Sequence, residues 1–313
     1  MINYLVRRLL YAIPTLVGVL LLTFALFYLV TPPEQLARQN LSAKNPTKKQ
    51  IDKWLKDHGY DQPRSEQFKK STLGLMTFDL GKSDRTKEPI INRIKQGAGP
   101  SGTLASMILL TALVTALTLA TTLAYFRGTY VDRAGTVLGV LLLSVPYIVY
   151  VLSMQYLMGK LLRYGPMAGF EPGWQSLRFI VIPVIIGVVA RIGGDVRLYR
   201  TFLLDEMNRD YVRTARAKGV KESAILFKHV LKNSMIPVIT TVVAIIPSLI
   251  LGSIIIEATF GIPGIGGYLQ EAIQNKDFAV IRAMVFIGTL LYIVGLILTD
   301  LLYAVVDPRV RIQ

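Results

Sequence analysis

Residues 101–126 read SGTLASMILLTALVTALTLATTLAYF and contain no charged side chain. A helix needs about 20 mainly apolar residues to cross the hydrocarbon core of a bilayer, so this stretch is long enough to span one. Lipid offers the backbone no hydrogen-bond partners, and therefore only helices and closed barrels can cross it. The stretch lacks the alternating pattern of barrel strands, which favours a transmembrane helix.

Five further stretches favour the same fold. Four are free of charged residues: Leu9–Val30, Ala134–Gly159, Asn233–Ile256 and Ala283–Thr299. The fifth, Phe179–Ala190, is shorter and lies between Arg178 and Arg191, whose side chains can reach the membrane interface. It could instead be a buried or re-entrant segment, but counting it as a span places the loops on consistent sides. The sequence thus predicts an all-α integral membrane protein with six transmembrane helices.

The overall composition agrees with this fold. Of the 313 residues, 52% are hydrophobic, and the net charge is +15. In a soluble protein this charge would suggest nucleic acid. Here, if the long region 31–100 is set aside, Lys and Arg are more numerous in the segments expected inside the cell than in the short loops expected outside. The region 31–100 holds 14 more, and a loop of this length is expected to cross the membrane largely regardless of charge. We therefore expect a multi-pass protein of the cytoplasmic (inner) membrane, with both termini in the cytoplasm, in contact with lipid and not with nucleic acid. The chain has no cysteine, which excludes disulfides and thiolate chemistry.

Three regions follow from this topology. Residues 1–30 form a cytoplasmic N-terminus and the first span, residues 31–100 a long external loop, and residues 101–313 the other five spans. The external region has too little apolar material for a robust core of its own, so we expect it to pack on the outer face of the membrane part. Within it, short helices are expected over 51–59 and 89–96.

The polar segment 203–235 lies between two expected spans on the cytoplasmic side. Leu203–Lys218 lacks Gly and Pro, which predicts a helix, and Gly219 interrupts it. Ser223 is expected to cap a second helix over 224–231. Pro237 stands where the next span is expected to begin.

One face of this segment suggests contact with a partner. Tyr211, Ala215 and Gly219 are spaced by four residues and would share a helix face. Two of the three are small, so the backbone of another protein could approach closely there. The alternative is an amphipathic helix that lies on the membrane surface, and periodicity alone does not separate the two.

Catalytic and cofactor sites are not expected. Gly81-Lys82-Ser83 resembles the end of a phosphate-binding loop, but the first Gly of that motif would fall at position 76, where the chain has Met76. His58 and His229 are isolated, so no metal site can be built from them. Any energy from ATP would therefore have to come from another chain.

Two features are candidates for gating. Pro146, Pro183 and Pro247 lie inside expected spans and could act as hinges, although proline is also common in membrane helices. Residues 260–266, FGIPGIG, hold too many helix breakers for a continuous helix. They form either a turn near an outer gate or an ordinary surface turn. The candidate gate or pathway residues are Pro146, Phe260, Pro263 and Gly264.

Six motifs occur in the order expected of one family. They are Tyr4-Leu-Val-Arg-Arg-Leu-Leu-Tyr-Ala-Ile-Pro14, Phe78-Asp-Leu-Gly-Lys-Ser83, Ser144-Val-Pro146, Asp210–Gly219 with 228–233 and Pro237, Glu257-Ala-Thr-Phe-Gly-Ile-Pro-Gly-Ile-Gly266, and Asp300-Leu-Leu-Tyr-Ala with Asp307-Pro-Arg309. Together they cover nearly the whole chain, which resembles the permease subunits of dipeptide, oligopeptide and nickel ABC importers. Two positions depart from the family pattern. Thr31-Pro32-Pro33-Glu34 replaces the usual Pro-Gly-Asp-Pro, and Arg213-Thr214-Ala215 replaces Glu-Ala-Ala.

The resemblance implies a type I importer architecture and a set of partners. A second, homologous permease would complete the pore, and two ATP-binding cassette ATPase subunits holding ATP and Mg would bind on the cytoplasmic side. An extracytoplasmic solute-binding protein would deliver peptides or similar small solutes. The chain itself would not be an enzyme. The ATPase-coupling residues would be Tyr211, Thr214, Ala215, Gly219, Ser223 and Phe227.

The alternative function is a stand-alone ion-coupled secondary transporter or channel. Such a carrier would need titratable groups near the middle of the membrane. Asp300 lies about 10 Å along a helix from Asp307, nearer the cytoplasmic interface, where we expect it to pair with an Arg. A carrier of this kind would also have no use for the segment 203–237.

Overall fold

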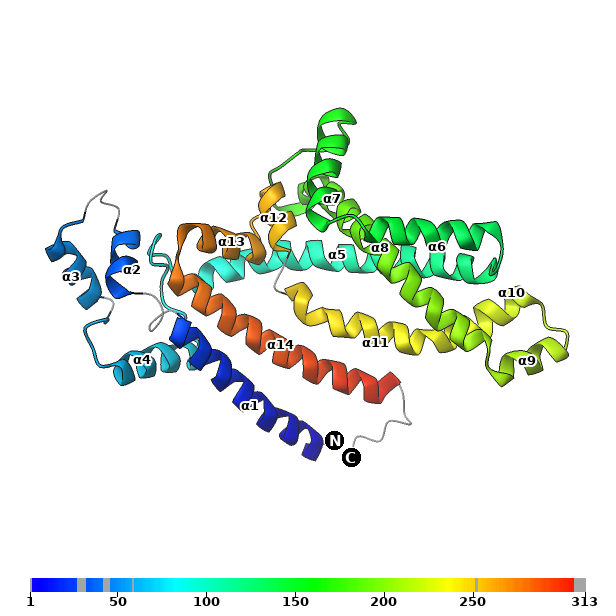
Figure 1. Ribbon diagram of the computed structural model, residues 1–313, viewed down its shortest axis with the longest axis horizontal. Coiled ribbons are helices and arrows are strands. Elements are labelled where there is room, and N and C mark those ends of the chain that lie inside the picture. Colours follow the sequence, from blue (N-terminus) through cyan, green and yellow to red (C-terminus); the bar gives the residue numbers. More distant parts are fainter. Residues whose placement is uncertain (1, 27–31, 42–45, 58, 251–252, 307–313) are drawn as a thin grey trace.

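The computed structural model describes residues 2–26, 32–41, 46–57, 59–250 and 253–306. Within these ranges the regular elements are helices, and the single strand-like feature is an isolated bridge between Lys82 and Pro89. The molecule is elongated, with its long helices side by side or crossing obliquely (Figure 1). The prediction of an all-α protein is confirmed for the part of the chain described.

The helices follow one another in the order α1 (Ile2–Phe24), α2 (Pro33–Asn40), α3 (Lys48–Asp57), α4 (Arg64–Met76), α5 (Ile90–Tyr125), α6 (Tyr130–Leu143), α7 (Tyr147–Met154), η2 (Gln155–Leu161), η3 (Gly173–Gln175), α8 (Ser176–Met207), α9 (Asp210–Ala217), α10 (Glu222–Ala224), η4 (Ile225–Val230), α11 (Leu231–Ile250), α12 (Ile254–Phe260), α13 (Ile265–Asn275) and α14 (Phe278–Val306). Within the described ranges, each of the six apolar stretches of the sequence falls largely on a helix or on two successive helices.

Three of these helices are long and apolar enough to cross a membrane: Ile90–Tyr125, Gly173–Met207 and Phe278–Leu298. The pair formed by α6 and by α7 with η2 would be a fourth span, bent by 92° at its break. The apolar part of α1, Leu10–Phe24, is shorter. The structure thus shows a multi-pass helical membrane protein, while six spans remain a prediction.

Helices α5 and α8 form the centre of the molecule. On α5, buried residues recur every four positions, from Leu104 through Ile108 to Ala112, Ala116 and Ala120. This stripe of increasingly small side chains lets α8 approach closely; a Cβ placed on Gly187 of α8 would come within 2.7 Å of the Ile108 side chain. Close packing of small residues is a main source of helix association in lipid, so a bulky residue at 187 would separate the pair.

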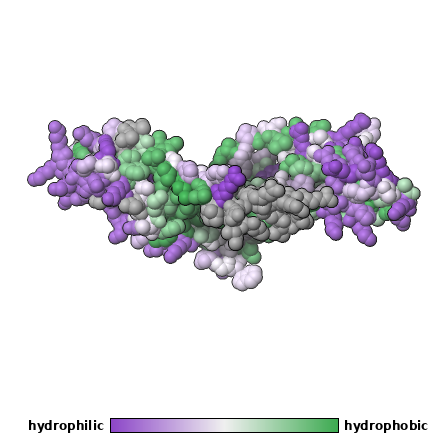
Figure 2. Space-filling model, turned by 90° about the horizontal axis from the view of Figure 1, so that it is seen from below, coloured by the Kyte–Doolittle hydropathy of each residue, from purple (hydrophilic) through white to green (hydrophobic). Residues whose placement is uncertain are grey.

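The two ends of the long axis differ from the middle. On the face shown in Figure 2, hydrophilic residues gather at both ends and hydrophobic residues lie between them. One end, the α9 end, consists of α9, α10, η4 and the turn 126–129 between α5 and α6. A second region, named the α13 end, consists of α12, α13 and the segment 78–89, and it lies between the middle of the molecule and the tip formed by α2, α3 and α4 (Figure 1). Helix α5 runs from beside α13 to the α9 end (Figure 1).

The region 31–100, which the sequence predicts to be external, makes apolar contacts with α14. Leu80 and Ile90 are buried in one apolar cluster with Val280 and Phe286 of α14. The ring of Phe78 also contacts that of Phe286, with centroids 6.1 Å apart. Helix α3 corresponds to the helix expected over 51–59.

Several local predictions need correction. No separate helix covers 89–96, because these residues begin α5. The helix expected over Leu203–Lys218 is broken after Met207, and α9 begins at Asp210. Pro237 lies inside α11 and not at its start. Of the prolines expected to kink spans, Pro146 stands at the sharp bend before α7, whereas Pro183 lies within the continuous helix α8.

Candidate functional site

Helix α9 is a short helix with well-formed ends. Asp210 lies in its first turn and Arg216 in its last, where each charge complements the helix dipole. Gly219 ends the element at φ +74°, and its N–H donates to the Arg216 carbonyl at 2.9 Å. A Cβ on Gly219 would meet nothing within 4 Å, so the backbone conformation, and not packing, requires glycine there.

One face of α9 is fixed to the rest of the chain. Val212 is fully buried in a cluster with Leu203 of α8 and Ile225 of η4, and Tyr211 and Ala215 pack against the same cluster. The Tyr211 hydroxyl lies 3.0 Å from a carboxylate oxygen of Glu206, and burial raises the pKa of this phenol. Tyr211 and Ala215 are therefore half-buried against the chain's own core, and Gly219 lies beyond the helix end.

The exposed face of α9 carries more basic than acidic side chains; its one acidic residue, Asp210, lies 3.6 Å from Arg213. This face presents Arg213, Thr214 and Arg216, followed by Ala217 and Lys218. An ion pair between Arg216 and Glu222 spans the turn at Gly219 and joins α9 to α10. Of the six predicted coupling residues, Thr214 and Gly219 lie on this surface.

Ser223 and Phe227 lie elsewhere. Ser223 is not the cap of the second helix; Lys221 occupies that position and no side chain caps it. Both residues line a mainly apolar groove of about 370 Å³ against the end of α5, with Thr118 and Phe126 among its other walls. The structure thus separates the predicted coupling residues into a core-facing pair, an exposed pair and a groove-lining pair.

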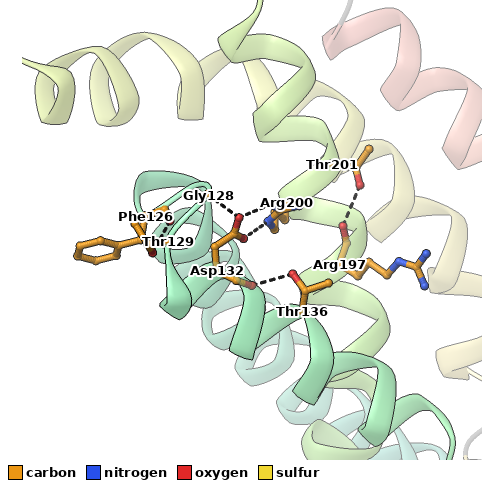
Figure 3. Close-up of polar contacts among 8 residues, drawn as sticks. All are labelled: Phe126, Gly128, Thr129, Asp132, Thr136, Arg197, Arg200 and Thr201. Carbon is orange, nitrogen blue, oxygen red and sulfur yellow. Dashed lines mark hydrogen bonds and ion pairs between the residues drawn. The ribbon is translucent and has the colours of Figure 1, made fainter.

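A buried ion pair braces the α9 end, and no sequence motif indicated it. Asp132, near the start of α6, accepts hydrogen bonds from Nε and Nη2 of Arg200 on α8, both at 2.8 Å (Figure 3). The N–H of Gly128 donates to the same carboxylate at 2.9 Å. The pair therefore ties the turn between α5 and α6 to α8, shortly before α8 leads into α9.

The predicted gate residues lie on a hairpin at the α13 end. Helix α12 ends at Phe260, which is 1% exposed, and Gly261 turns the chain in the left-handed conformation at φ +64°. Pro263 and Gly264 form the turn before α13. Pro146 is not part of this hairpin, although α7, which it precedes, contacts α12.

A cavity of about 880 Å³ opens beside this hairpin. Its lining comes from the start of α5, the loop before α8 and the hairpin itself, and includes Arg93, Phe170, Ile180, Glu257, Gly264 and Tyr268. Burial is the main cause that raises the pKa of Tyr268 to about 12. Its hydroxyl has no hydrogen-bond partner within the described chain.

Two carboxylates at the α13 end are buried without being paired to a basic side chain in the described ranges. Glu257 is fully buried and lies in the motif quoted from the sequence, but its role was not predicted. Asp277, between α13 and α14, accepts from the Ser83 hydroxyl and from the N–H of Asp84 at 3.2 Å. Ser83, which resembles part of a phosphate loop in sequence, thus docks the segment 78–89 on the turn between α13 and α14. Among the described residues no group of three His, Cys, Asp or Glu could hold a metal ion.

Comparison with known proteins identifies the family. The family model "binding-protein-dependent transport system inner membrane component" matches residues 112–312. The chain belongs to this family. It is 30% identical to the oligopeptide transport system permease protein AppB of Bacillus subtilis, covering 99% of this chain and 100% of the relative. It is 32% identical to the glutathione transport system permease protein GsiC of Pectobacterium atrosepticum, over 99% of this chain and 99% of the relative.

A putative peptide transport system permease protein of Brucella abortus is also 32% identical, over 97% of this chain and 98% of the relative. These relatives match along nearly their full lengths and not only within the region of the family model. The long segment before residue 112, with α1 and the region 31–100, is therefore shared with such permeases.

Proposed function

We propose that this chain is the permease subunit of an ATP-driven ABC importer that moves peptides or similar small solutes across the inner membrane. The single observation that carries the mechanism is that α9 is packed against the protein on one face and exposed on the other. Its inner face is fixed to α8 and η4 through Val212, while its outer face presents a row of basic side chains. A force applied to such an element is passed to the long helix behind it.

The energy would come from separate ATPase subunits that bind the exposed face of α9. A basic surface of this kind complements an acidic groove on a partner. Because the other face of α9 is packed against the chain's own core, α9 can transmit a displacement to α8, which a helix lying loosely on the membrane surface could not do. A second permease would complete the pore, and a solute-binding protein would dock at the α13 end. In this arrangement all six apolar helices span the membrane, and both termini lie in the cytoplasm.

The docking surface can be tested by charge reversal. Arg213→Glu combined with Lys218→Glu should prevent co-purification of the partner ATPase subunits expressed together with this chain, without loss of the permease from the membrane. Arg133→Glu, an exposed arginine at the same end on α6, is the matched control and should leave the complex intact. Retention of the ATPases by the double variant would contradict the assignment.

The topology can be tested with single cysteines, since the native chain has none. Thr214→Cys should react with a membrane-impermeant maleimide only in inside-out vesicles, and Lys87→Cys only in right-side-out vesicles. The opposite pattern would reverse the orientation and remove the proposed coupling site.

An autonomous carrier is less well supported. Glu257 is the one fully buried carboxylate among the described side chains, and its hydrogen bonds are to uncharged groups that hold a loop. The side chain of Asp300 and all of Asp307 lie outside the described residues. Accumulation of a labelled dipeptide by this chain alone in proteoliposomes would favour the carrier.

A further inference from the structure

Glu257 is the centre of a hydrogen-bond network, called the hub below, that joins three separate parts of the chain. Its Oε1 accepts hydrogen bonds from the Ser101 hydroxyl of α5 at 2.8 Å and from the N–H of Ser253 at 3.0 Å. Its Oε2 accepts from the N–H of Gly267 on α13 at 3.0 Å. An ionised carboxylate only accepts hydrogen bonds, so it matches three donors, and no other side chain of this length would satisfy them all.

Ser101 extends the hub to the turn of the hairpin. Its hydroxyl donates to Glu257 and accepts from the N–H of Ile265 at 2.8 Å. The turn fits without spare room: a Cβ on Gly264 would lie 2.2 Å from a carboxylate oxygen of Glu257 and 2.4 Å from the Ser101 hydroxyl. A Cβ on Gly97 of α5 would lie 2.9 Å from the Gly264 carbonyl carbon. The hairpin and α5 are thus in direct backbone contact around one carboxylate.

We propose that Glu257, acting through Ser101, is a positioning residue that locks the α12–α13 hairpin to the first part of α5, so that both move as one body. Helix α12 has only seven residues and could not hold its shape alone. Its hydrogen bonds to α5 would supply the missing constraint. The idea of movement rests on the proposed function; the lock itself does not.

The lock is expected to control whether water reaches the apolar residues that the hairpin covers. Ile256, Phe260 and Ile262 form one buried cluster with Ile180 of α8, which is 0% exposed. The hairpin also forms one wall of the 880 Å³ cavity, which Ile180 borders. If the lock fails, the hairpin should lift from α8 and water should reach Ile180 from the cavity.

The test uses Ile180→Cys as a reporter in the full-length chain, in isolated membranes, with a water-soluble maleimide as the probe. Because the native chain has no cysteine, labelling reports this site alone. Labelling should be slow in the otherwise native chain and at least about tenfold faster with Glu257→Ala, since removing one partner leaves buried donors unpaired. Ser101→Ala should give a smaller increase. Glu257→Gln should be milder than Glu257→Ala, because its carbonyl can still accept from Ser101 and Ser253.

Glu271→Gln is the matched control. Glu271 lies on the same hairpin but is exposed and contacts Arg93 at 3.4 Å, so its removal should leave labelling unchanged. A second reporter, Val212→Cys at the α9 end, separates local opening from unfolding and should stay protected throughout.

Unchanged labelling of the Ile180→Cys reporter in Glu257→Ala and Ser101→Ala would overturn the lock. Equal labelling of the Ile180→Cys and Val212→Cys reporters in all variants at Glu257 and Ser101 would also overturn it. Uptake of a labelled dipeptide by the assembled transporter is measured separately. Selective exposure of the first reporter without any peptide uptake would support the lock and count against the proposed function.

Discussion

The α9 end and the α13 end both contain buried carboxylates, but they satisfy them in different ways. At the α9 end, Asp132 is neutralised by the guanidinium of Arg200. At the α13 end, Glu257 and Asp277 accept hydrogen bonds from hydroxyls and backbone N–H groups. A side-chain pair is lost on mutation of either partner, whereas backbone donors depend on the shape of the loop that presents them. The ion pair at the α9 end joins two helices, whereas the hydrogen bonds at the α13 end hold loop segments in place.

This difference fits the work proposed for each end. The α9 end has to transmit force from one helix to the next, and an ion pair between α6 and α8 links whole helices. The α13 end has to hold a hairpin and an external segment in place, and many weak contacts to the backbone suit that purpose. Four predictions test the contrast, from the largest expected effect to the smallest.

Removing the carboxylate of the ion pair should have the largest effect. Asp132→Ala leaves Arg200 largely buried without its partner, which should cost about 3 kcal/mol of stability. Thermal unfolding of the solubilised protein, followed by fluorescence size exclusion, measures this loss. Exchanging the charges in Asp132→Arg with Arg200→Asp should not restore stability, because Gly128 would lose the acceptor of its N–H. Full rescue by the exchange would show that the backbone bond is unimportant.

Removing one hydroxyl at the other end should cost less. Ser83→Ala removes the hydroxyl that donates to Asp277 and accepts from the N–H groups of Arg85 and Thr86. The N–H groups of Asp84 and Val280 still donate to Asp277. The expected loss is about 1 kcal/mol, with faster proteolysis within the segment 78–89. Lys82→Ala, an exposed neighbour, is the control and should behave as the native chain. Equal sensitivity of the two variants would mean that Ser83 does not anchor the segment.

The turn after α9 should respond to backbone strain alone. Gly219→Ala places a side chain in open space but at φ +74°, and should cost about 1 kcal/mol. Gly219→Asn should be better tolerated, since asparagine adopts this conformation more readily. Stability of the permease and retention of its ATPases are the two measurements. A neutral Gly219→Ala variant would show that the turn can rearrange.

The smallest effect concerns Tyr268 at the α13 end. Its pKa is raised from 10.0 to about 12, so the folded chain keeps the phenol proton where the unfolded chain loses it. The stability that this proton contributes is present below pH 10 and is lost as the pH rises toward 12. Tyr268→Phe should abolish this part of the alkaline decline. An ultraviolet titration should likewise show one fewer late-ionising tyrosine.

The membrane fold could be predicted from the sequence because hydrophobic runs are local. A stretch such as 101–126 leaves its backbone no partner other than itself in lipid, whatever surrounds it. Helix α5 therefore appears where it is expected, although it begins earlier, at Ile90. The likeness to a permease family could also be read from motifs, since their order along the chain survives folding. Local turn chemistry was equally visible, and Gly219 does end its helix.

The tertiary structure alone decided which face of α9 is free and which groups are paired. Tyr211 and Ala215 have the spacing of a contact face in sequence, but whether that face meets a partner or the core depends on where α8 and η4 lie. Asp132 and Arg200 are 68 residues apart, and Ser83 and Asp277 are 194 apart. Hydrogen bonds within a helix join near neighbours and follow from residue order. The burial of a carboxylate and the choice of its donor depend on packing between distant helices, which no local pattern encodes.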